Sequence, residues 1–202
     1  NIPEGVSVNL SGAASELERT WIAMKNNVMI ALFVIFLLLT VLMKSFVLPL
    51  VIMITVPVAG AGGVLGLVFL NQFSVQPLDM LTMLGFIILA GIVVNNSILM
   101  VEQTLWHIRH ESMIISEAIT EATRNRIRPI FMSTLTSLFG LIPLVIFPGS
   151  GSELYRGIGT VVFGGLATSA ILTLLMVPPL LALALKTEKL KPVSEVKEDL
   201  FA

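Results

Sequence analysis

Five long stretches of this chain contain no Asp, Glu, Lys, Arg or His, and they constrain its fold more than any other feature. Crossing the ~30 Å hydrocarbon core of a bilayer takes roughly 20 apolar residues of helix. Each stretch meets that requirement. We therefore expect an all-α integral membrane protein with five spans, at residues 26–43, 46–70, 80–101, 129–147 and 157–185.

The composition supports this class and excludes others. Only 12% of the 202 residues are charged, whereas a soluble domain carries about 25%. The net charge of −1 gives no reason to expect nucleic acid as a partner. There is no cysteine, and His107 and His110 lack a nearby third ligand, so no metal site is predicted. Because no phosphate loop, catalytic triad or paired-carboxylate site occurs, we expect neither an enzyme nor a bound cofactor.

The basic residues predict the orientation, because cytoplasmic connections are enriched in Lys and Arg. One side of the membrane receives nine of the twelve, including Arg124, Arg126 and Arg128, which we interpret as cytoplasmic anchors. The other side receives Arg19, Lys25 and Arg156. The C-terminus is therefore predicted to be cytoplasmic and the N-terminus to lie outside.

Three segments lie between or beyond the spans. Residues 1–25 read as the end of an extracytoplasmic domain: a short strand with alternating Val6, Val8 and Leu10, then a helix opened by the Ser15-x-x-Glu18 pattern. Residues 112–127 have one apolar and one polar side, which predicts a helix along the cytoplasmic interface. Residues 186–202 are rich in Lys and Glu, and we expect a disordered cytoplasmic tail.

The third span carries two adjacent asparagines, Asn95 and Asn96. Amides in hydrocarbon are costly unless something satisfies them, so they mark either a polar relay or hydrogen bonds that hold helices together. In the fourth span, Ser133 and Thr134 offer hydroxyls for a relay, although such groups often bond to the preceding turn of their own helix.

Glycines at spacings that favour close helix packing form a third group. The Gly62-x-x-x-Gly66 pattern is the clearest case, because small residues four apart let two helices approach closely. The predicted packing positions are Gly60, Gly62, Gly66, Gly85, Gly91, Gly164 and Gly165.

Several sequence blocks, in order, resemble the C-terminal membrane half of resistance-nodulation-division (RND) efflux permeases of the hydrophobe/amphiphile type. They are IPEG…LSG, MKSFVLPLVIMITVPVAGAGG, LGFIILAGIVVNNSILMVE, EAITEATRNRIRPIFMSTLTSLFGLIPL, GSGSELYRGIGTVVFGGLATS and VPPLLAL. The resemblance implies that the five spans correspond to the last five of twelve helices. It further implies drug or amphiphile export by proton antiport in a Gram-negative inner membrane. A homotrimer, a periplasmic adaptor and an outer-membrane channel would be its partners.

The resemblance also implies roles for particular residues. Proton-driven pumps place a titratable carboxylate in the membrane, and none of the five spans has one. The N-terminal half of the family fold would supply it, and Asn95, Asn96, Ser133 and Thr134 would form the facing relay. Well-known multidrug members have lysine at the position of Asn95 and threonine at that of Ser133, so a charge-swap mechanism is in doubt.

Two alternatives stay open at this point. One is the related protein-export membrane subunit of the SecD/SecF type, whose Asn-Asp-Thr corresponds to Asn95-Asn96-Ser97 here and whose acid is absent. The other is a structural or assembly module that carries out no transport of its own.

Overall fold

A computed structural model describes residues 13–76, 78–146, 149 and 152–188. These residues form five helices and no strand, and all five helices are long and apolar enough to cross a membrane. The expected all-α membrane fold is thereby confirmed, while the strand predicted near residue 8 lies outside the described residues. The helices are α1 (Ala13–Met43), α2 (Val47–Asn71), α3 (Met80–His110), α4 (Ile115–Ile146) and α5 (Ser152–Glu188).

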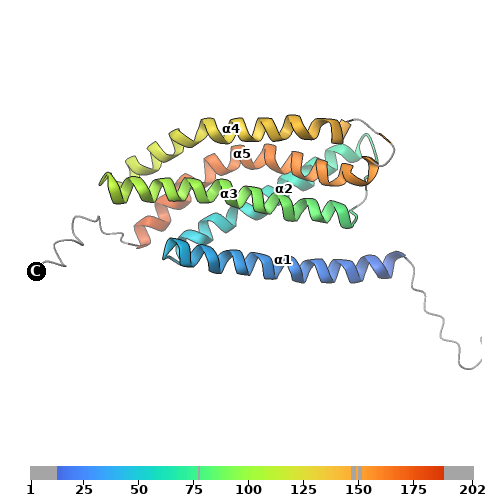
Figure 1. The fold of residues 1–202 in the computed structure, drawn as a ribbon, viewed down its shortest axis with the longest axis horizontal. Helices are drawn as coiled ribbons and strands as arrows, with labels where there is room; N and C mark the ends of the chain where they lie inside the picture. Colours follow the sequence, from blue (N-terminus) through green and yellow to red (C-terminus); the bar gives the residue numbers. More distant parts are fainter. Residues whose placement is uncertain (1–12, 77, 147–148, 150–151, 189–202) are drawn as a thin grey trace, which may run out of the picture.

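Helices α2, α3, α4 and α5 pack together, and α1 lies along the side of this group. Figure 1 shows α5 between α4 and α3, with α2 crossing beside it, and α5 contacts all three of these helices. Helix α1 has its main contacts with α2 and α3. Only 11% of its spanning window is buried, the same share as for α4 and less than the 39% for α2 and for α3, so α1 and α4 both lie at the periphery of the bundle.

Two clusters of buried apolar side chains fill the bundle. The larger one joins the start of α2, the second half of α3, the start of α4 and the end of α5, through residues such as Ile52, Met100, Ala118 and Leu181. The smaller one surrounds Leu89 where α2, α3 and α5 meet. Lipid is as apolar as these side chains, so burying them in the bundle does not gain from the hydrophobic effect. Their close van der Waals packing stabilises the bundle instead.

Glycines on α2 and α5 bring the backbones of these two helices into close contact. A Cβ added to Gly66 would lie 2.9 Å from the Thr160 carbonyl oxygen and 3.0 Å from the Cα of Gly164. A Cβ on Gly164 would in turn lie 2.8 Å from the carbonyl oxygen of Gly62. The two backbones therefore touch along the predicted Gly62-x-x-x-Gly66 face, and only glycine fits there.

The remaining predicted packing glycines fall into two groups. Gly85 and Gly165 also lie at helix contacts, against the backbone of Ile158 and the side chain of Leu89. Gly60 and Gly91, in contrast, have no neighbouring atom within 4 Å of an added Cβ. These two glycines therefore pack no other helix of the described chain.

The structure differs from the sequence-based expectation at residues 112–127. They do not form a separate helix, because α4 runs without a break from Ile115 through Pro129 to Ile146. Proline inside a helix removes one hydrogen bond and disturbs the preceding turn. Here buried side chains at four-residue spacing continue on both sides of it, so packing against α3 and α5 holds the helix together. The buried side chains on the two sides of Pro129 are those of Ala118, Ala122, Ile130 and Thr134.

Two prolines also occur near the end of α5. The helix continues past Pro178 and Pro179 to Glu188. Figure 1 shows its red C-terminal part bending away from α4, as proline-containing helices commonly do. Leu181 and Leu185 beyond the bend are fully buried, which shows that this last part still belongs to the core.

Replacing Gly66 by leucine is expected to destabilise the bundle, because the added side chain would force α2 and α5 apart. Overpacking of this kind costs about 1–3 kcal/mol. The measurement is the free energy of unfolding in mixed detergent micelles, followed by circular dichroism. Gly140→Leu is the matched control, since an added Cβ at Gly140 meets nothing within 4 Å. Equal stability of the two variants would contradict the glycine contact.

Candidate functional site

Three consecutive polar residues of α3 point in three different directions. Asn95 stands fifteen residues from either end of α3 (Met80–His110) and is exposed. Asn96 is partly buried and Ser97 is fully buried. Successive residues of a helix are about 100° apart, so three consecutive polar residues can place one side chain on the packed face of α3 and another on its exposed face.

The buried member, Ser97, forms a polar contact between two helices. Its Oγ lies 3.1 Å from Oγ1 of Thr55 on α2 and also donates to the carbonyl oxygen of Val93, at 3.1 Å. Thr55 donates to the carbonyl oxygen of Ile52 at 2.6 Å. The two hydroxyl protons cannot fill all three contacts at once, so the Ser97–Thr55 bond that joins α2 to α3 forms when one hydroxyl donates to the other instead of to the carbonyl of its own helix. The sequence could not predict this contact, because spacing along the chain does not reveal that Thr55 lies opposite Ser97.

Asn95 belongs to an open side of α3. Ile88, Ile92 and Glu102 are exposed at helical spacings from it, so they share its side of the helix. The side chains of Asn95 and Asn96 make no hydrogen bond to any described residue. An amide in the middle of a spanning helix without a partner is costly in hydrocarbon. This side of α3 is therefore the candidate site for a polar partner.

The two hydroxyl residues predicted for the relay are separated by the rotation of α4. Ser133 is exposed, and its Oγ donates to the carbonyl oxygen of Ile130 at 3.1 Å. Thr134 lies on the buried face, four residues after Ile130. No hydrogen bond joins either of them to Asn95 or Asn96 within the described chain. Of the four predicted residues, Asn95 and Ser133 are the ones that face outward.

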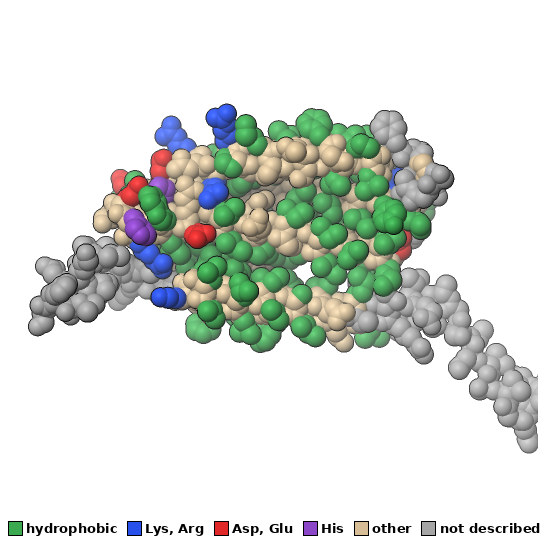
Figure 2. Space-filling view, in the orientation of Figure 1, with side chains coloured by type: hydrophobic (Ala, Val, Ile, Leu, Met, Phe, Trp, Pro, Cys, Tyr) green, Lys and Arg blue, Asp and Glu red, His purple; other side chains and the backbone are tan. Residues whose placement is uncertain are grey.

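Charged side chains gather at one end of the bundle, and Figure 2 shows them beside a broad hydrophobic surface. Arg124 and Arg128 are exposed there, while Arg126 donates from Nε to Oε1 of Gln103 at 2.6 Å and so ties α4 to α3. This distribution fits the expected anchoring of one membrane surface by basic residues.

A histidine at the same end is buried. The Nδ1 of His107 lies 2.6 Å from Oε2 of Glu111, and its Nε2 is buried without a hydrogen-bond partner among the described residues. The ring of His110 stacks on Trp106 instead of turning toward His107. No group of three potential metal ligands occurs in the described part of the chain.

These features define a multi-pass helical membrane protein with a packed glycine-rich interior and an open polar side at the middle of one helix. Residues 1–184 match the model of the AcrB/AcrD/AcrF family, and the chain belongs to this family of RND multidrug efflux permeases. The match favours the efflux interpretation over the protein-export alternative.

Comparison with curated proteins gives the same family. The chain is 37% identical to a multidrug resistance protein MdtC of Erwinia tasmaniensis over 177 residues, and 36% identical to that of Erwinia amylovora. The MdtC of Escherichia coli is 37% identical over the same length. In each case the alignment covers 88% of this chain and 17% of the relative. The chain thus spans about a sixth of the length of these relatives.

The Ser97–Thr55 contact predicts a measurable coupling between α2 and α3. We expect the variants Ser97→Ala and Thr55→Val to lower the free energy of unfolding, and their double-mutant cycle to give about 0.6 kcal/mol, the average for interhelical hydrogen bonds in membranes. Thr136→Ala with Thr55→Val is the control cycle, since Thr136 is exposed and bonds only to Met132 of its own helix. Strictly additive effects of the first pair would refute the contact.

Proposed function

We propose that this chain supplies membrane helices of a proton-driven efflux transporter that exports drugs or amphiphiles by proton antiport. The transporter would reside in the inner membrane of a Gram-negative bacterium. It would assemble as a homotrimer with a periplasmic adaptor and an outer-membrane channel, and the proton gradient would be its energy source. Membership of the family and the relatives described as multidrug resistance proteins support this proposal.

The observation that carries the proposal is the exposed Asn95 at the middle of α3. It has no hydrogen-bond partner in the described chain, although its depth makes an unpaired amide costly. None of the five spanning windows predicted from the sequence contains an acid. In the proposal, the open side of α3 faces titratable carboxylates on helices outside this chain.

An asparagine would serve such carboxylates differently from a lysine. Its amide has two N–H donors and an acceptor oxygen, so it can donate to an ionised carboxylate and accept from a protonated one. A lysine, with three donors and a positive charge, favours only the ionised form. We therefore propose that Asn95 orients the carboxylates in both protonation states without neutralising them.

The other three predicted relay residues take unequal parts in this proposal. Ser133 is exposed on α4, and in the proposal its hydroxyl meets the same partner helices. Asn96 is partly buried, and Thr134 lies on the packed face of α4. We propose that Asn95 and Ser133 line the proton path. Asn96 and Thr134 would help to hold α3 and α4 in position.

The decisive variant is Asn95→Leu in the assembled transporter. Hydrogen bonds to charged groups are worth about 1.5–3 kcal/mol, so losing one is expected to reduce efflux about tenfold or more. The measurement is the rate of dye efflux from cells that contain equal amounts of each variant. Asn95→Gln keeps the amide and is expected to retain part of the activity.

Unchanged efflux with Asn95→Leu at normal protein levels would remove the relay role. Asn95 would then be a packing residue, and the chain a structural module. Ile92→Leu, a change on the same open side of α3 that keeps the surface apolar, is the control for nonspecific effects on helix packing.

A further inference from the structure

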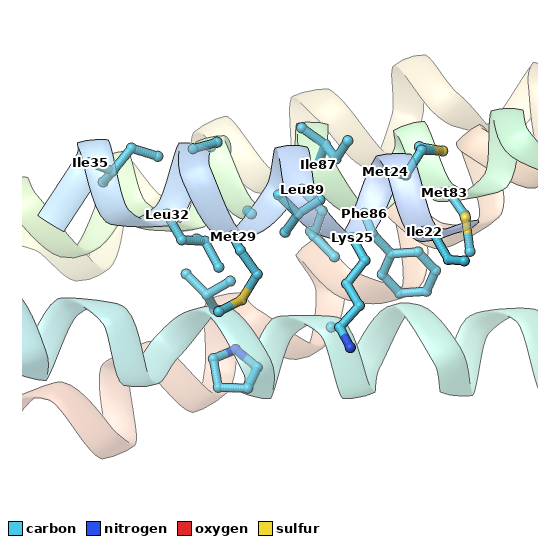
Figure 3. Close-up of a pocket in the computed structure, with 17 residues that line it drawn as sticks. Ile22, Met24, Lys25, Met29, Leu32, Ile35, Met83, Phe86, Ile87 and Leu89 are labelled. Atoms are coloured by element: carbon cyan, nitrogen blue, oxygen red, sulfur yellow. The ribbon is translucent and has the colours of Figure 1, made fainter. Parts of the chain in front are cut away.

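A deep groove separates α1 from α2 and α3. Its volume is about 1010 Å³, at the upper end of the size of small-molecule sites. Among the described residues seventeen line it, and sixteen of these are apolar or glycine. Figure 3 shows side chains of α1 and α3 directed toward this space, and Figure 2 shows an opening between α1 and the rest of the bundle. A void of this size without an occupant would forfeit many van der Waals contacts.

The groove has the depth of one leaflet. Along α1 its lining runs from Ile22 to Ile35, and the part from Lys25 to Ile35 measures ~15 Å at 1.5 Å per residue. This is half of the ~30 Å hydrocarbon core. Beyond Ile35 the helix closes onto the bundle, since Leu39 and Met43 are only 1% and 6% exposed and belong to the larger core cluster.

This closed end decides between two kinds of occupant. A spanning helix would have to continue through the full thickness of the membrane, and the packed Leu39 and Met43 leave it no path along α1. An acyl chain needs only the depth of its own leaflet. The length of the groove therefore fits a lipid tail and does not fit a further transmembrane helix.

One charged side chain lines the groove. Lys25 is the only charged residue among the described residues of the lining, and it stands at the start of the spanning window Met24–Met43. Figure 3 shows its amine directed away from α1 into the groove. No acidic side chain of the described chain pairs with it. A lysine near the end of a spanning helix can extend its amine to the headgroup layer, where lipid phosphate is a partner for it.

Two glycines leave room in the wall of the groove. Gly60 on α2 and Gly91 on α3 both line it, and a Cβ added to either would meet no atom within 4 Å. No neighbouring side chain of the described chain covers the helix backbones at these two glycines. An apolar chain can lie against them, whereas water would find almost no polar partner in this lining.

We propose that the groove binds an anionic phospholipid from the leaflet on the Lys25 side, with its phosphate on the Lys25 amine and an acyl chain against Gly60 and Gly91. The lipid would fill the space between the peripheral α1 and the bundle. It would thereby hold α1 in place where direct contacts between helices are few.

Photo-crosslinking tests this proposal. The full chain is placed in nanodiscs that contain phosphatidylglycerol or phosphatidylcholine with a diazirine in the acyl chain, and labelled residues are mapped by mass spectrometry. We expect labelling of Met83, Phe86 and Ile87, which line the groove. Because a basic residue near an anionic surface contributes about 1 kcal/mol, phosphatidylglycerol is expected to label them about fivefold more than phosphatidylcholine.

Matched variants separate the charge from the cavity. Lys25→Ala is expected to remove the preference for phosphatidylglycerol, whereas Lys44→Ala, beyond the far end of the α1 span, leaves it unchanged. Gly91→Leu and Gly60→Leu are expected to lower labelling by filling the groove, whereas Gly140→Leu, which does not line it, is the control.

Three results would overturn the proposal. Equal labelling by both lipids would remove the role of the charge, and so would a preference that survives Lys25→Ala. Labelling confined to outward residues of α1, such as Phe33, with none on Phe86, would show that a protein segment fills the groove. If Gly60→Leu does not fold, the Gly91→Leu and Lys25→Ala variants still give the answer.

Discussion

The backbone contact between α2 and α5 is the constraint on which the rest of the bundle depends. Gly62 and Gly66 on one helix meet Gly164 on the other with no side chain between them. In lipid, helices gain little from hiding apolar surface, so dispersion contacts at such short range carry much of the association. With α2 and α5 fixed together, α3 packs across both, and α4 completes the bundle on the other side of α5.

The orientation of α3 follows from this arrangement and gives the chain its candidate site. Leu89 and Ser97 face inward, against α5 and against Thr55 of α2, and this rotation turns Asn95 outward. Helix α3 thus contributes to the buried core on one side and presents an unpaired amide on the opposite side. One end of α1 is packed into the same bundle while its other end stands away, which leaves the groove that Lys25 helps to line.

The positions of the spans could be predicted from the sequence, because length and absence of charge are local properties. The continuity of α4 could not: the helix passes through Pro129, because buried contacts with neighbouring helices override local signals. The site was predicted in part. The asparagines were visible as polar residues in an apolar span, but which of Asn95 and Ser97 faces inward depends on neighbours that only the folded chain supplies.

Disulfide trapping tests the central α2–α5 contact most directly, and the chain has no native cysteine to interfere. A Cβ on Gly62 would lie 2.5 Å from the Cβ of Thr168, so about 1 Å of separation brings the pair into disulfide range. We predict rapid oxidation in membranes of the double variant Gly62→Cys, Thr168→Cys, and none of Gly60→Cys, Thr168→Cys. Crosslinking of the second pair, or failure of the first, would contradict the account.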